Sequence, residues 1–566
     1  MLANDRAQFP TTATVAGLPP DRVRGRGATV PFVEYEAENA VTNARLIGPD
    51  RSFTSLLSEA SGRRAVLLLK AGDFVEFTLG RPANAISVRY AVPDGNDGRG
   101  VDSALGVYAG GRRIGSLATT SRYGWFYGSY PFTNRPADGK PHHFYDEARL
   151  LLGRTLPAGT KMRLMKDNSD QAGWYAVDLA NFELVPPPKT PPPFAVSITD
   201  FGADPSGTRD SWMPIRKAIA EARKRRVPVW IPPGRFTVSR HIIVDRVTVA
   251  GAGPWHSILR GKGVGIYGHE APRGSRAVVL RDFALIGEVT ERKDKERLAG
   301  IGGAIGGGSI IEDLWIQHHK VGVWLDGPLD GITLRRLRIV DNTADGLNFR
   351  RGVSNAVVED SFIRNSGDDG LAMWSHREAN RNNAFRRNTI VAPILANGIA
   401  VYGGRDIEIS GNLVADTLTQ GGGIHFGNRF DAVPFSGRTV VSNNFIVRAG
   451  SFDPNWRFGV GGLWFYALDH PIAASIEVSD TDIEDSTLPA LHFIGKRIEG
   501  IVFKDIRIRG AGSHAMQIQS GGSASFRGVR ASGLLLGGTL ECHEGFVLID
   551  LGANSGWADK HRQPCG

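Results

Sequence analysis

One five-residue pattern recurs through the second half of the chain, as VGVWL at Val321, DGLNF at Asp345, DGLAM at Asp369, NGIAV at Asn397, GGIHF at Gly422, GGLWF at Gly461, PALHF at Pro489 and HAMQI at His514. Its second residue is Gly or Ala, and its third and fifth residues are apolar. Successive copies are 24, 24, 28, 25, 39, 28 and 25 residues apart. A period in the twenties with strand-like alternation is typical of a solenoid with one coil per repeat. Leucine-rich repeats have similar periods, but their leucine and asparagine spacing is absent, so the pattern predicts a parallel β-helix.

Strand alternation divides the side chains of these repeats between a core and an outer face. Two apolar columns are expected to point inward: Leu347, Leu371, Ile399, Ile424 and Leu463, and Phe349, Met373, Val401, Phe426 and Phe465. Two further columns are expected to point outward: Trp324, Asn348, Ala372, Ala400, His425 and Trp464, and Asp326, Arg350, Trp374, Tyr402, Gly427 and Tyr466. Because neighbouring coils lie about 4.8 Å apart, the outward columns should form one continuous face rich in aromatic and hydrogen-bonding groups.

Exposed aromatic side chains are unfavourable unless something covers them, and two kinds of cover remain open here. A carbohydrate chain along the face would use the flat apolar rings, whereas a long loop or the first domain would bury them. The first alternative gives seven candidate substrate-binding residues: Asn348, Arg350, Trp374, Tyr402, His425, Trp464 and Trp324.

Three aspartates stand where a turn enters the strands of this face. Asp345 and Asp369 occupy the same position in consecutive coils, and Asp368 adjoins Asp369. Three carboxylates within two coil heights repel one another, so at least one should have a raised pKa, as a general acid requires. The alternative is a structural Asp/Asn turn ladder, which Asp341 and Asn365 resemble. We take Asp345, Asp368 and Asp369 as the predicted catalytic residues.

A polyproline spacer, PPPKTPPP at residues 186–193, marks the clearest domain boundary. Before it, residues 31–185 show alternating strand patterns without a strong amphipathic helix, and residues 1–30 are expected to form a flexible leader. After it, residues 194–566 form the predicted β-helix domain.

The β-helix segment begins with a predicted helix that can cover the open end of the solenoid. Asp210 can cap this helix, and Ile215, Ile219 and Ala222 recur at helical spacing. The motif FGA, followed by a helix and a PPG turn, closely resembles the start of pectin-lyase-like β-helices.

The first segment opens with VEYEAENA at Val33 and closes with GWYAVDLANFEL at Gly173. This pairing resembles the β-sandwich carbohydrate-binding modules of families 6 and 35, in which acidic residues of the first and last strands hold a structural calcium ion. The resemblance makes Glu36, Glu38 and Asp178 candidate ligands of Ca²⁺, which prefers oxygen donors. The alternative is that they are only edge-strand charges. The predicted fold class is all-β, with a right-handed parallel β-helix preceded by a β-sandwich (jelly-roll) domain.

The aromatic stretch SRYGWFYGSYPF, which begins at Ser121, has two open interpretations. It can form a platform on which sugars stack, or a surface that packs against the second domain.

The motifs NTADG at Asn342 and GDDG at Gly367 resemble the aspartate arrangement of glycoside hydrolase family 28, the polygalacturonases. That family's downstream histidine motif and its basic Arg-Ile-Lys element are missing, which argues against a uronic-acid substrate. The chain is more similar to glycoside hydrolase family 87, the α-1,3-glucanases and mycodextranases, which join a family-35-like module to a β-helix and carry an Asp followed by an Asp-Asp pair one coil later. The phrases YGSYPF, KPHHFYDE and NSGDDGLAMWS add to this resemblance, which covers most of residues 31–530.

The family 87 resemblance implies endo-acting, inverting hydrolysis of α-1,3-glucosidic linkages in α-1,3-glucan or nigeran, with no cofactor for catalysis. In an inverting mechanism one carboxyl protonates the leaving oxygen, while a second, about 6.5–9.5 Å away, activates water. By analogy, Asp368 is the general acid, and Asp345 with Asp369 is the base or water-positioning pair.

The composition is that of an ordinary soluble protein, with 41% hydrophobic and 22% charged residues. The formal charge of +9 fits a solvated basic surface or an acidic polymer partner, but no Lys/Arg run interleaved with aromatics indicates nucleic acid. No apolar stretch approaches the ~20 residues needed to span a membrane, and residues 1–20 lack the apolar core of a signal peptide. Cys542 and Cys565 can form one disulfide or remain two free thiols. We expect a secreted monomer whose partner is a polysaccharide.

Two other classes of function remain open. A polysaccharide lyase, which would use the aspartates as a calcium site, or a polygalacturonase-like hydrolase would share the β-helix. A non-catalytic polysaccharide-binding protein would keep its affinity in Asp345→Asn and Asp368→Asn variants and would release no reducing ends.

Overall fold

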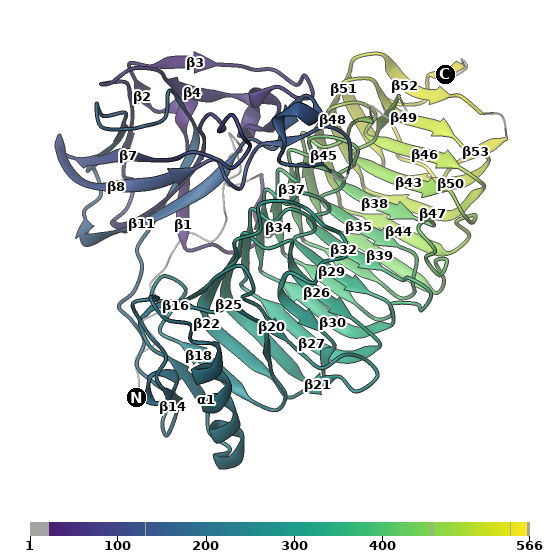
Figure 1. Ribbon diagram of the computed structural model, residues 1–566. Coiled ribbons are helices and arrows are strands. Elements are labelled where there is room, and N and C mark those ends of the chain that lie inside the picture. Colours follow the sequence, from purple (N-terminus) through teal and green to yellow (C-terminus); the bar gives the residue numbers. More distant parts are fainter. Residues whose placement is uncertain (1–17, 19–21, 131, 454–456, 544, 563–566) are drawn as a thin grey trace, which may run out of the picture.

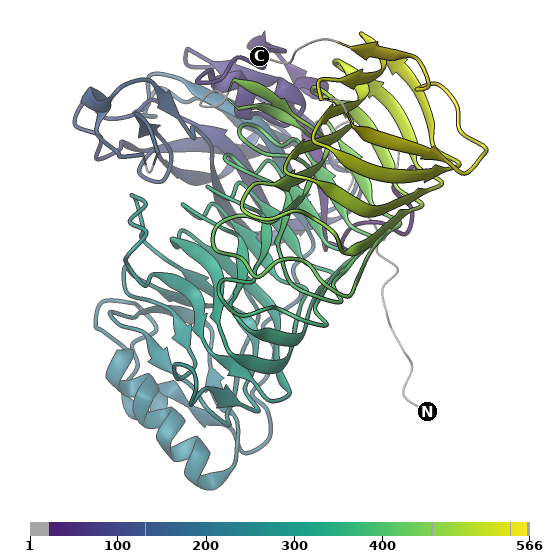
Figure 2. The same ribbon diagram turned by 90° about the vertical axis from the view of Figure 1, so that its right-hand side faces the viewer.

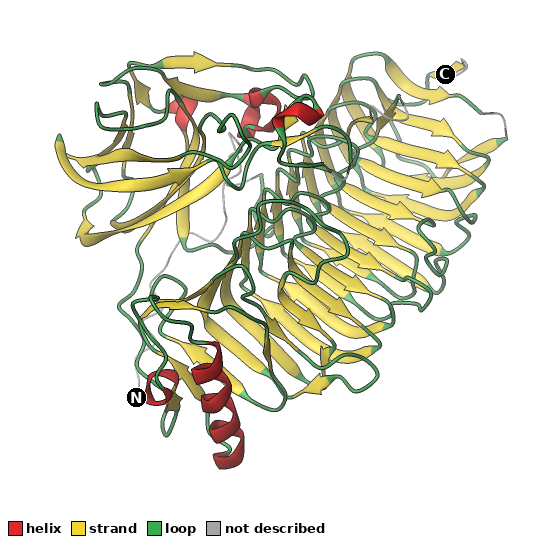
Figure 3. Ribbon diagram, in the orientation of Figure 1, coloured by secondary structure: helices red, strands yellow, loops and turns green. Residues whose placement is uncertain are grey.

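The structure, a computed structural model, describes residues 18, 22–130, 132–453, 457–543 and 545–562. Figure 1 shows a β-sandwich from the N-terminal third of the chain beside a long parallel β-helix that extends from α1 to the C-terminal end. Strands dominate both parts (Figure 3), and α1 (Trp212–Arg225) is the only α-helix among the described residues. The predicted all-β class, with a β-sandwich before a parallel β-helix, is confirmed. The short 3₁₀ helices are η1 (Ala37–Asn39), η2 (Leu56–Glu59), η3 (Ser61–Arg63), η4 (Pro136–Asp138) and η5 (Ile198–Phe201).

The first domain consists of two antiparallel sheets that face each other. One sheet has the order β11-β6-β13-β4-β3, with β1 also paired to β13, and the other has the order β2-β5-β12-β7-β8. Inward side chains of both sheets, such as Val66, Ile86, Leu105 and Val107, are fully buried between them. The strands are β1 (Phe32–Glu36), β2 (Val41–Thr42), β3 (Arg45–Ile47), β4 (Ala65–Leu68), β5 (Phe74–Thr78), β6 (Ala83–Ala91), β7 (Asp102–Ala109), β8 (Arg112–Thr120), β11 (Asp146–Leu156), β12 (Lys161–Met165) and β13 (Tyr175–Glu183), with a separate pair β9 (Phe126–Tyr127) and β10 (Pro141–His142).

The second domain winds around two long parallel sheets. The 13-stranded sheet contains, in order, β17 (Ile242–Ile243), β20 (Ile266–Tyr267), β23 (Ala299–Gly303), β26 (Val321–Asp326), β29 (Leu347–Arg350), β32 (Leu371–Trp374), β35 (Ile399–Tyr402), β38 (Ile424–Gly427), β43 (Leu463–Ala467), β46 (Leu491–Gly495), β49 (His514–Gln519), β52 (Gly537–Glu541) and β54 (Lys560–Arg562).

The 24-stranded sheet takes two strands from most coils, and Figure 2 shows the stack of coils turned by 90° from the view of Figure 1. Its strands are β14 (Val196–Ser197), β15 (Val229–Ile231), β16 (Gly234–Thr237), β18 (Thr248–Gly251), β19 (Ser257–Arg260), β22 (Val279–Ile286), β25 (Ser309–Gln317), β27 (Leu329–Arg335), β28 (Arg338–Val340), β30 (Val353–Glu359), β31 (Phe362–Arg364), β33 (Ala384–Arg386), β34 (Thr389–Val391), β36 (Glu408–Ser410), β37 (Leu413–Ala415), β39 (Arg438–Ser442), β40 (Phe445–Val447), β44 (Ser475–Ser479), β45 (Asp482–Ser486), β47 (Ile498–Lys504), β48 (Arg507–Ala511), β50 (Gly522–Arg527), β51 (Arg530–Leu534) and β53 (Phe546–Asp550). Two short pairs lie apart, β21 (Ser275–Arg276) with β24 (Ile305–Gly306) and β41 (Ser451–Asp453) with β42 (Phe458–Val460).

The core of the β-helix is built from the predicted inward columns. In the register of β29 and β32, Leu347 lies beside Leu371, and Phe349 lies beside Met373. All ten predicted inward side chains have a relative exposure of 0%. Because the repeat has the same spacing in successive coils, apolar side chains stack on apolar side chains along the solenoid.

Helix α1 closes the N-terminal end of this core, as predicted. Ile215, Ile219 and Ala222 are buried in the same apolar cluster as the first coils. Asp210 lies two residues before Trp212, the first residue of the helix. Its Oδ1 accepts a hydrogen bond from the backbone N–H of Trp212 at 3.1 Å. The helix thus shields the first strands from solvent.

The first domain packs against the 24-stranded sheet. Phe32 meets Phe362 edge-on, with ring centroids 5.3 Å apart. Arg364 is fully buried and forms ion pairs with Glu34 and Glu147 of the first domain, each at 2.6 Å. A buried charge keeps both of its partners only when the two domains are docked, so this ion-pair group ties the domains together.

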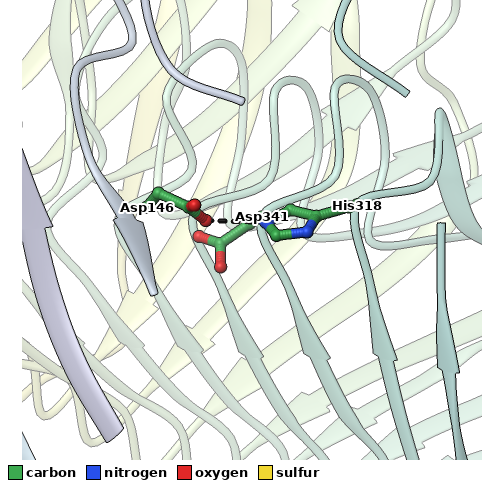
Figure 4. Close-up of side chains that lie close together, drawn as sticks. All are labelled: Asp146, His318 and Asp341. Carbon is green, nitrogen blue, oxygen red and sulfur yellow. Dashed lines mark hydrogen bonds and ion pairs between the residues drawn. The ribbon is translucent and has the colours of Figure 1, made fainter. Parts of the chain in front are cut away.

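A second polar group in this interface contains Asp146, His318 and Asp341 (Figure 4). One ligand-type atom of each lies within 4.8 Å of the other two, and His318 Nε2 is 2.7 Å from Asp146 Oδ1. Tyr123 stacks on the His318 ring, with centroids 3.6 Å apart. Since Tyr123 belongs to the stretch SRYGWFYGSYPF, that stretch packs against the second domain at this point.

Residues 22–30 correct the expectation of a flexible leader. Val23 is fully buried, and Arg26 forms an ion pair with Asp482 of the β-helix. The segment lies along the outside of the coils, where its apolar side chains are buried and Arg22 and Arg26 form ion pairs with Glu484 and Asp482. Residues 1–17 and 19–21 lie outside the described residues.

The proline-rich linker at 186–193 also lies against the β-helix. The backbone N–H of Lys189 donates to Ala252 O at 2.9 Å, and Lys189 Nζ is 2.6 Å from Asp282 Oδ1. The linker is therefore a docked connection as well as a spacer.

The structure also bears on the state of the cysteines and on membrane-spanning segments. Cys542 is disulfide-bonded, and the part of the chain that the structure describes has no free cysteine. Cys565 falls outside it. None of the described helices is long and apolar enough to cross a membrane.

Candidate active site

Asp345, Asp368 and Asp369 come together at one edge of the 13-stranded sheet. Asp345 stands two residues before β29, and Asp369 two residues before β32, its neighbour in the stack. Each of the three offers a carboxylate oxygen within 4.8 Å of the other two. The structure thus brings together the three residues that the sequence singled out.

The glycine after each aspartate is required because the coils stack closely here. Gly346 N donates to Asp369 O at 3.0 Å, and a Cβ on Gly346 would lie only 2.4 Å from Gly370 O. A Cβ on Gly370 would lie 2.4 Å from Cγ2 of Ile390. A side chain at either glycine would push the coils apart, so the Asp-Gly pairs fix where the carboxylates project.

Asp369 is buried and accepts three hydrogen bonds. Asn397 donates from its backbone N–H at 2.9 Å and from Nδ2 at 2.8 Å, both to Oδ1, and Tyr402 Oη donates to Oδ2 at 2.9 Å. Burial and the nearby charge of Asp368 nevertheless raise the pKa of Asp369 to about 7. This carboxyl can therefore exchange a proton near neutral pH.

Asp345 has less support for a negative charge. Its Oδ2 accepts one hydrogen bond, from Asn348 Nδ2 at 2.9 Å. Burial, followed by the charges of Asp368 and Asp369, raises the pKa of Asp345 well above its ordinary value. The sequence-based expectation of at least one raised carboxyl pKa is therefore confirmed.

Asp368 is the most exposed of the three, with 21% of its side chain accessible. It has a charged partner that the sequence-based interpretation missed: Arg292 Nη1 lies 2.7 Å from Asp368 Oδ2. Burial lowers the pKa of Arg292, but the negative charge of Asp368 leads the contributions that raise it above its ordinary value. Arg292 belongs to the loop 287–298 between β22 and β23, a charged stretch with no periodicity that looks like a solvated loop in the sequence.

The outward columns are paired as predicted, but they are far less exposed than predicted. The register places His425 beside Trp464, and Trp374 beside Tyr402. Relative exposures are 8% for Tyr402, 0% for His425, 1% for Trp464 and 4% for Asn348. The expectation of a continuous exposed aromatic face is therefore wrong for these residues, whereas Trp324, Arg350 and Trp374 remain half-buried.

Loops that fold back over the sheet explain this burial. The Phe430 ring lies 5.4 Å from that of Tyr402, and Phe430 O accepts a hydrogen bond from Trp374 Nε1 at 2.9 Å. The ring of Phe458 lies 6.4 Å from that of Trp464. Both segments belong to the 39-residue step of the repeat. The unusual length of this step is therefore the feature of the sequence that indicates an insertion covering the aromatic columns.

The predicted substrate-binding residues consequently have different roles in the structure. Asn348 and Tyr402 hold the carboxylates of Asp345 and Asp369. His425 and Trp464 form a buried aromatic stack with ring centroids 4.1 Å apart.

Arg350 is also engaged within the protein. Its Nη1 lies 3.1 Å from both carboxylate oxygens of Asp326, and its Nη2 lies 2.9 Å from His376 Nδ1. Its guanidinium lies 5.3 Å from the centroid of the Trp374 ring. Trp324 and Trp374 are the two predicted residues that keep aromatic surface open beside the cluster.

The three predicted calcium ligands do not form one ligand group. Asp178 is fully buried and pairs with Arg89 at 2.5 Å. Glu36 and Glu38 each keep a buried oxygen without a hydrogen-bond donor, but the described residues contain no group in which these two and Asp178 meet within 4.8 Å. The donor set therefore does not fit a single calcium ion, because one of its carboxylates already has a cation.

Comparison with known proteins identifies the family. Residues 29–185 match the sequence family described as alpha-1,3-glucanase catalytic domain D1, and residues 210–515 match alpha-1,3-glucanase catalytic domain D2. A curated relative, the preneck appendage protein of Bacillus phage PZA, is 25% identical over 231 residues, which are 39% of this chain and 26% of that protein. The chain thus spans about a quarter of the length of that relative.

Solved structures are similar over nearly the whole chain. The catalytic unit of the thermostable GH87 α-1,3-glucanase from Streptomyces thermodiastaticus strain HF3-3 is 40% identical, with a TM-score of 0.86, and the match covers 94% of this chain and 98% of that one. The catalytic domain of a GH87 α-1,3-glucanase in complex with nigerose is 25% identical, with a TM-score of 0.80, over 94% of this chain and 100% of that one. The chain belongs to glycoside hydrolase family 87, the family of α-1,3-glucanase catalytic domains.

Proposed function

We propose that the protein hydrolyses α-1,3-glucosidic linkages in α-1,3-glucan or nigeran, with Asp345, Asp368 and Asp369 as its catalytic residues. The observation that carries the proposal is the meeting of three carboxylates within 4.8 Å beside a partly exposed position on the β-helix. A related catalytic domain has been solved with nigerose, the α-1,3-linked glucose disaccharide. Two Asp-to-Ala variants of such a domain, 24 positions apart, were also solved with nigerose, and Asp345 and Asp369 are 24 residues apart as well.

The environments of the three carboxylates support a division of work between acid and base. Asp368 forms an ion pair with Arg292. Asp345 accepts only one side-chain hydrogen bond and has a pKa well above its ordinary value, and Asp369 has a pKa of about 7. We assign the transferable proton of the free enzyme to the Asp345–Asp369 pair and the negative charge to Asp368. This differs from the expectation of Asp368 as the acid, because the Arg292 guanidinium lies 2.7 Å from Asp368 Oδ2.

In this scheme the Asp345–Asp369 pair gives a proton to the leaving glycosidic oxygen. Asp368 accepts a proton from the water that attacks the anomeric carbon, and product release with proton exchange restores the starting state. No metal or organic cofactor takes part in these steps.

Inversion remains part of the proposal on the strength of the family resemblance. The carboxylates approach within 4.8 Å, which is shorter than the ~6.5–9.5 Å typical of inverting pairs. The anomer of the first product therefore needs a direct measurement: β-glucose ends in the ¹H NMR spectrum indicate inversion, and α ends indicate retention.

Endo action and secretion extend the same proposal. β29 is the fifth strand of the 13-stranded sheet, so coils continue on both sides of the cluster, as cleavage inside a long chain requires. An insoluble glucan cannot enter a cell, which supports secretion. We retain a monomer as the proposed state because the β-helix carries one complete cluster per chain.

The test is a substrate screen. The protein is incubated with insoluble α-1,3-glucan, pectin and dextran, with and without EDTA, and reducing ends and ultraviolet absorbance are followed. The proposal predicts reducing ends from α-1,3-glucan alone, at a rate that EDTA does not change. Ultraviolet-absorbing products that depend on calcium would instead indicate a lyase, and an intact α-1,3-glucan would overturn the substrate assignment.

A further inference from the structure

A residue of the first domain reaches the aspartate cluster through Arg292. Tyr130 Oη donates a hydrogen bond to Asp294 Oδ2 at 2.8 Å and accepts one from Arg292 Nη2 at 3.2 Å. The Arg292 guanidinium also lies 5.0 Å from the centroid of the Tyr130 ring, a distance at which a cation is attracted to an aromatic face. Tyr130 is half-exposed, with a relative exposure of 52%, so it forms part of the rim of the site.

The three nitrogens of Arg292 all have separate partners. Nε donates to Asp294 Oδ1 at 2.8 Å, Nη2 donates to Tyr130 Oη, and Nη1 faces Asp368. Only 10% of the Arg292 side chain is exposed. Hydrogen bonds from Nε and Nη2 fix the direction of the planar guanidinium, so Tyr130 and Asp294 set the orientation of Nη1 toward Asp368, with which Nη1 forms an ion pair.

The loop that carries Arg292 is itself anchored to the β-helix. Gly287 N donates to Gln317 O at 2.8 Å, and Val289 N donates to His318 O at 3.0 Å. Farther along, Lys320 Nζ donates to Asp294 O at 2.8 Å. The loop is therefore held beside the cluster at its start and at Asp294.

The electrostatic surroundings of Asp368 leave Arg292 as its one close cation. Asp345 and Asp369 face Asp368 as like charges, the Tyr130 and Tyr402 hydroxyls lie in its field, and Lys320 and Asp294 stand behind Arg292. Among the described residues, no other Lys, Arg or His forms an ion pair with any of the three aspartates. Removing Arg292 would leave the three neighbouring carboxylates without an ion-pair partner among the described residues.

We propose that Tyr130 and Arg292 are a positioning pair that fixes the orientation and negative charge of Asp368, so that the first domain completes the active site. This inference rests on the proposed function, in which Asp368 is the charged member of the cluster. The first domain then has a part in the chemistry in addition to its part in stability.

Four variants of the full-length chain test the proposal on α-1,3-glucan, with kcat, KM and thermal midpoint measured for each. Arg292→Gln should lower kcat about tenfold or more at a nearly unchanged KM, and Arg292→Lys should restore part of this loss. Because Nη1 no longer holds the Asp368 carboxylate in place in Arg292→Gln, the loss should appear in kcat while the thermal midpoint stays close to that of the parent. Tyr130→Phe should lower kcat by less, again at a nearly unchanged KM. Tyr108→Phe, whose hydroxyl also donates to an aspartate, Asp167, at 2.7 Å, should change nothing.

A parent-like kcat in Arg292→Gln, with a parent-like thermal midpoint, would overturn the proposal. So would an equal loss in Tyr108→Phe and Tyr130→Phe, which would indicate a general effect on the first domain. If the parent chain fails to cleave α-1,3-glucan, the proposed function fails on its own. The positioning pair is then decided by crystal structures of the parent and Arg292→Gln: the Asp368 side chain should leave its parent orientation in the variant, and an unchanged orientation would overturn the inference.

Discussion

The protein has two clusters of three titratable side chains that look alike by distance and differ in their surroundings. Asp345, Asp368 and Asp369 form one, and the interdomain group of Asp146, His318 and Asp341 forms the other; in both, the ligand-type atoms lie within 4.8 Å of one another. The interdomain group is buried in all three members, whereas the aspartate cluster keeps one member partly open to solvent.

Hydrogen bonding separates the two clusters further. Asp341 accepts from Asn365 Nδ2 at 2.7 Å, from Gln317 Nε2 at 2.8 Å and from the backbone N–H of Glu147 at 3.2 Å. Asp345 accepts a single side-chain hydrogen bond. The three donors hold Asp341 in place inside the interface, whereas Asp345 has one donor and a partly exposed neighbour, Asp368, through which it can exchange a proton.

The largest expected effect is on catalysis, in Asp345→Asn. Because the side chain can then no longer supply a proton, kcat on α-1,3-glucan should fall by about 10²–10⁴-fold, with little change in thermal midpoint. On α-nigerosyl fluoride, whose leaving group needs no proton, most of the activity should return. A loss of less than tenfold on the polymer would remove Asp345 from the proposed proton-bearing pair.

The interdomain group should give the opposite result. Asp341→Ala removes the acceptor of one buried N–H of Asn365 and one of Gln317, so the free energy of unfolding should fall by about 2–5 kcal/mol, while kcat per folded molecule stays close to that of the parent. Denaturant unfolding and active-site-normalised rates measure the two quantities. Asp360→Ala, which breaks only partly exposed ion pairs with Arg387, is the control and should cost about 1 kcal/mol or less.

The pKa of Asp369 predicts a stability effect of the reverse sign at the active site. A folded pKa of about 7 lies above the ordinary value of this carboxyl, so its contribution to stability is present below about pH 4 and is lost as the pH rises through 7. Asp369→Asn cannot ionise, so its stability should exceed that of the parent at pH 8 by about 1 kcal/mol or more. Thermal unfolding at pH 4 and pH 8 measures this; equal differences at both values would refute the linkage.

The smallest effect should come from Tyr402→Phe. The Tyr402 hydroxyl donates to Asp369 and lowers its pKa, so its removal raises that pKa. The alkaline limb of the pH–rate profile should then move up by about half a unit to one unit. A downward shift would contradict a role for the Asp369 proton in catalysis.

The repeat itself was predictable because its evidence lies in local alternation. The columns through Leu347 and Phe349, the closing helix with Ile215 and the clustering of Asp345 with Asp369 all follow from spacing along the chain. Each depends on a strand or helix period that the sequence states directly.

The remaining parts depend on contacts between segments far apart in sequence. Arg292 lies in an irregular loop and forms an ion pair with Asp368. Phe430 lies in the long insertion of the repeat and covers Tyr402, and Val23 is buried only because the N-terminal segment packs against the folded coils. No periodicity encodes such contacts, so the burial of the aromatic columns and the order of residues 22–30 became visible only in three dimensions.

The most direct test of the central claim is the rate of reducing-end release from insoluble α-1,3-glucan by the parent chain and by Asp368→Asn, with thermal unfolding as the check on folding. Our account predicts rapid release by the parent, a loss of about 10²–10⁴-fold in the variant and nearly equal thermal midpoints. A well-folded Asp368→Asn protein that cleaves α-1,3-glucan at the parent rate would contradict it, because the chemistry would then lie outside the aspartate cluster.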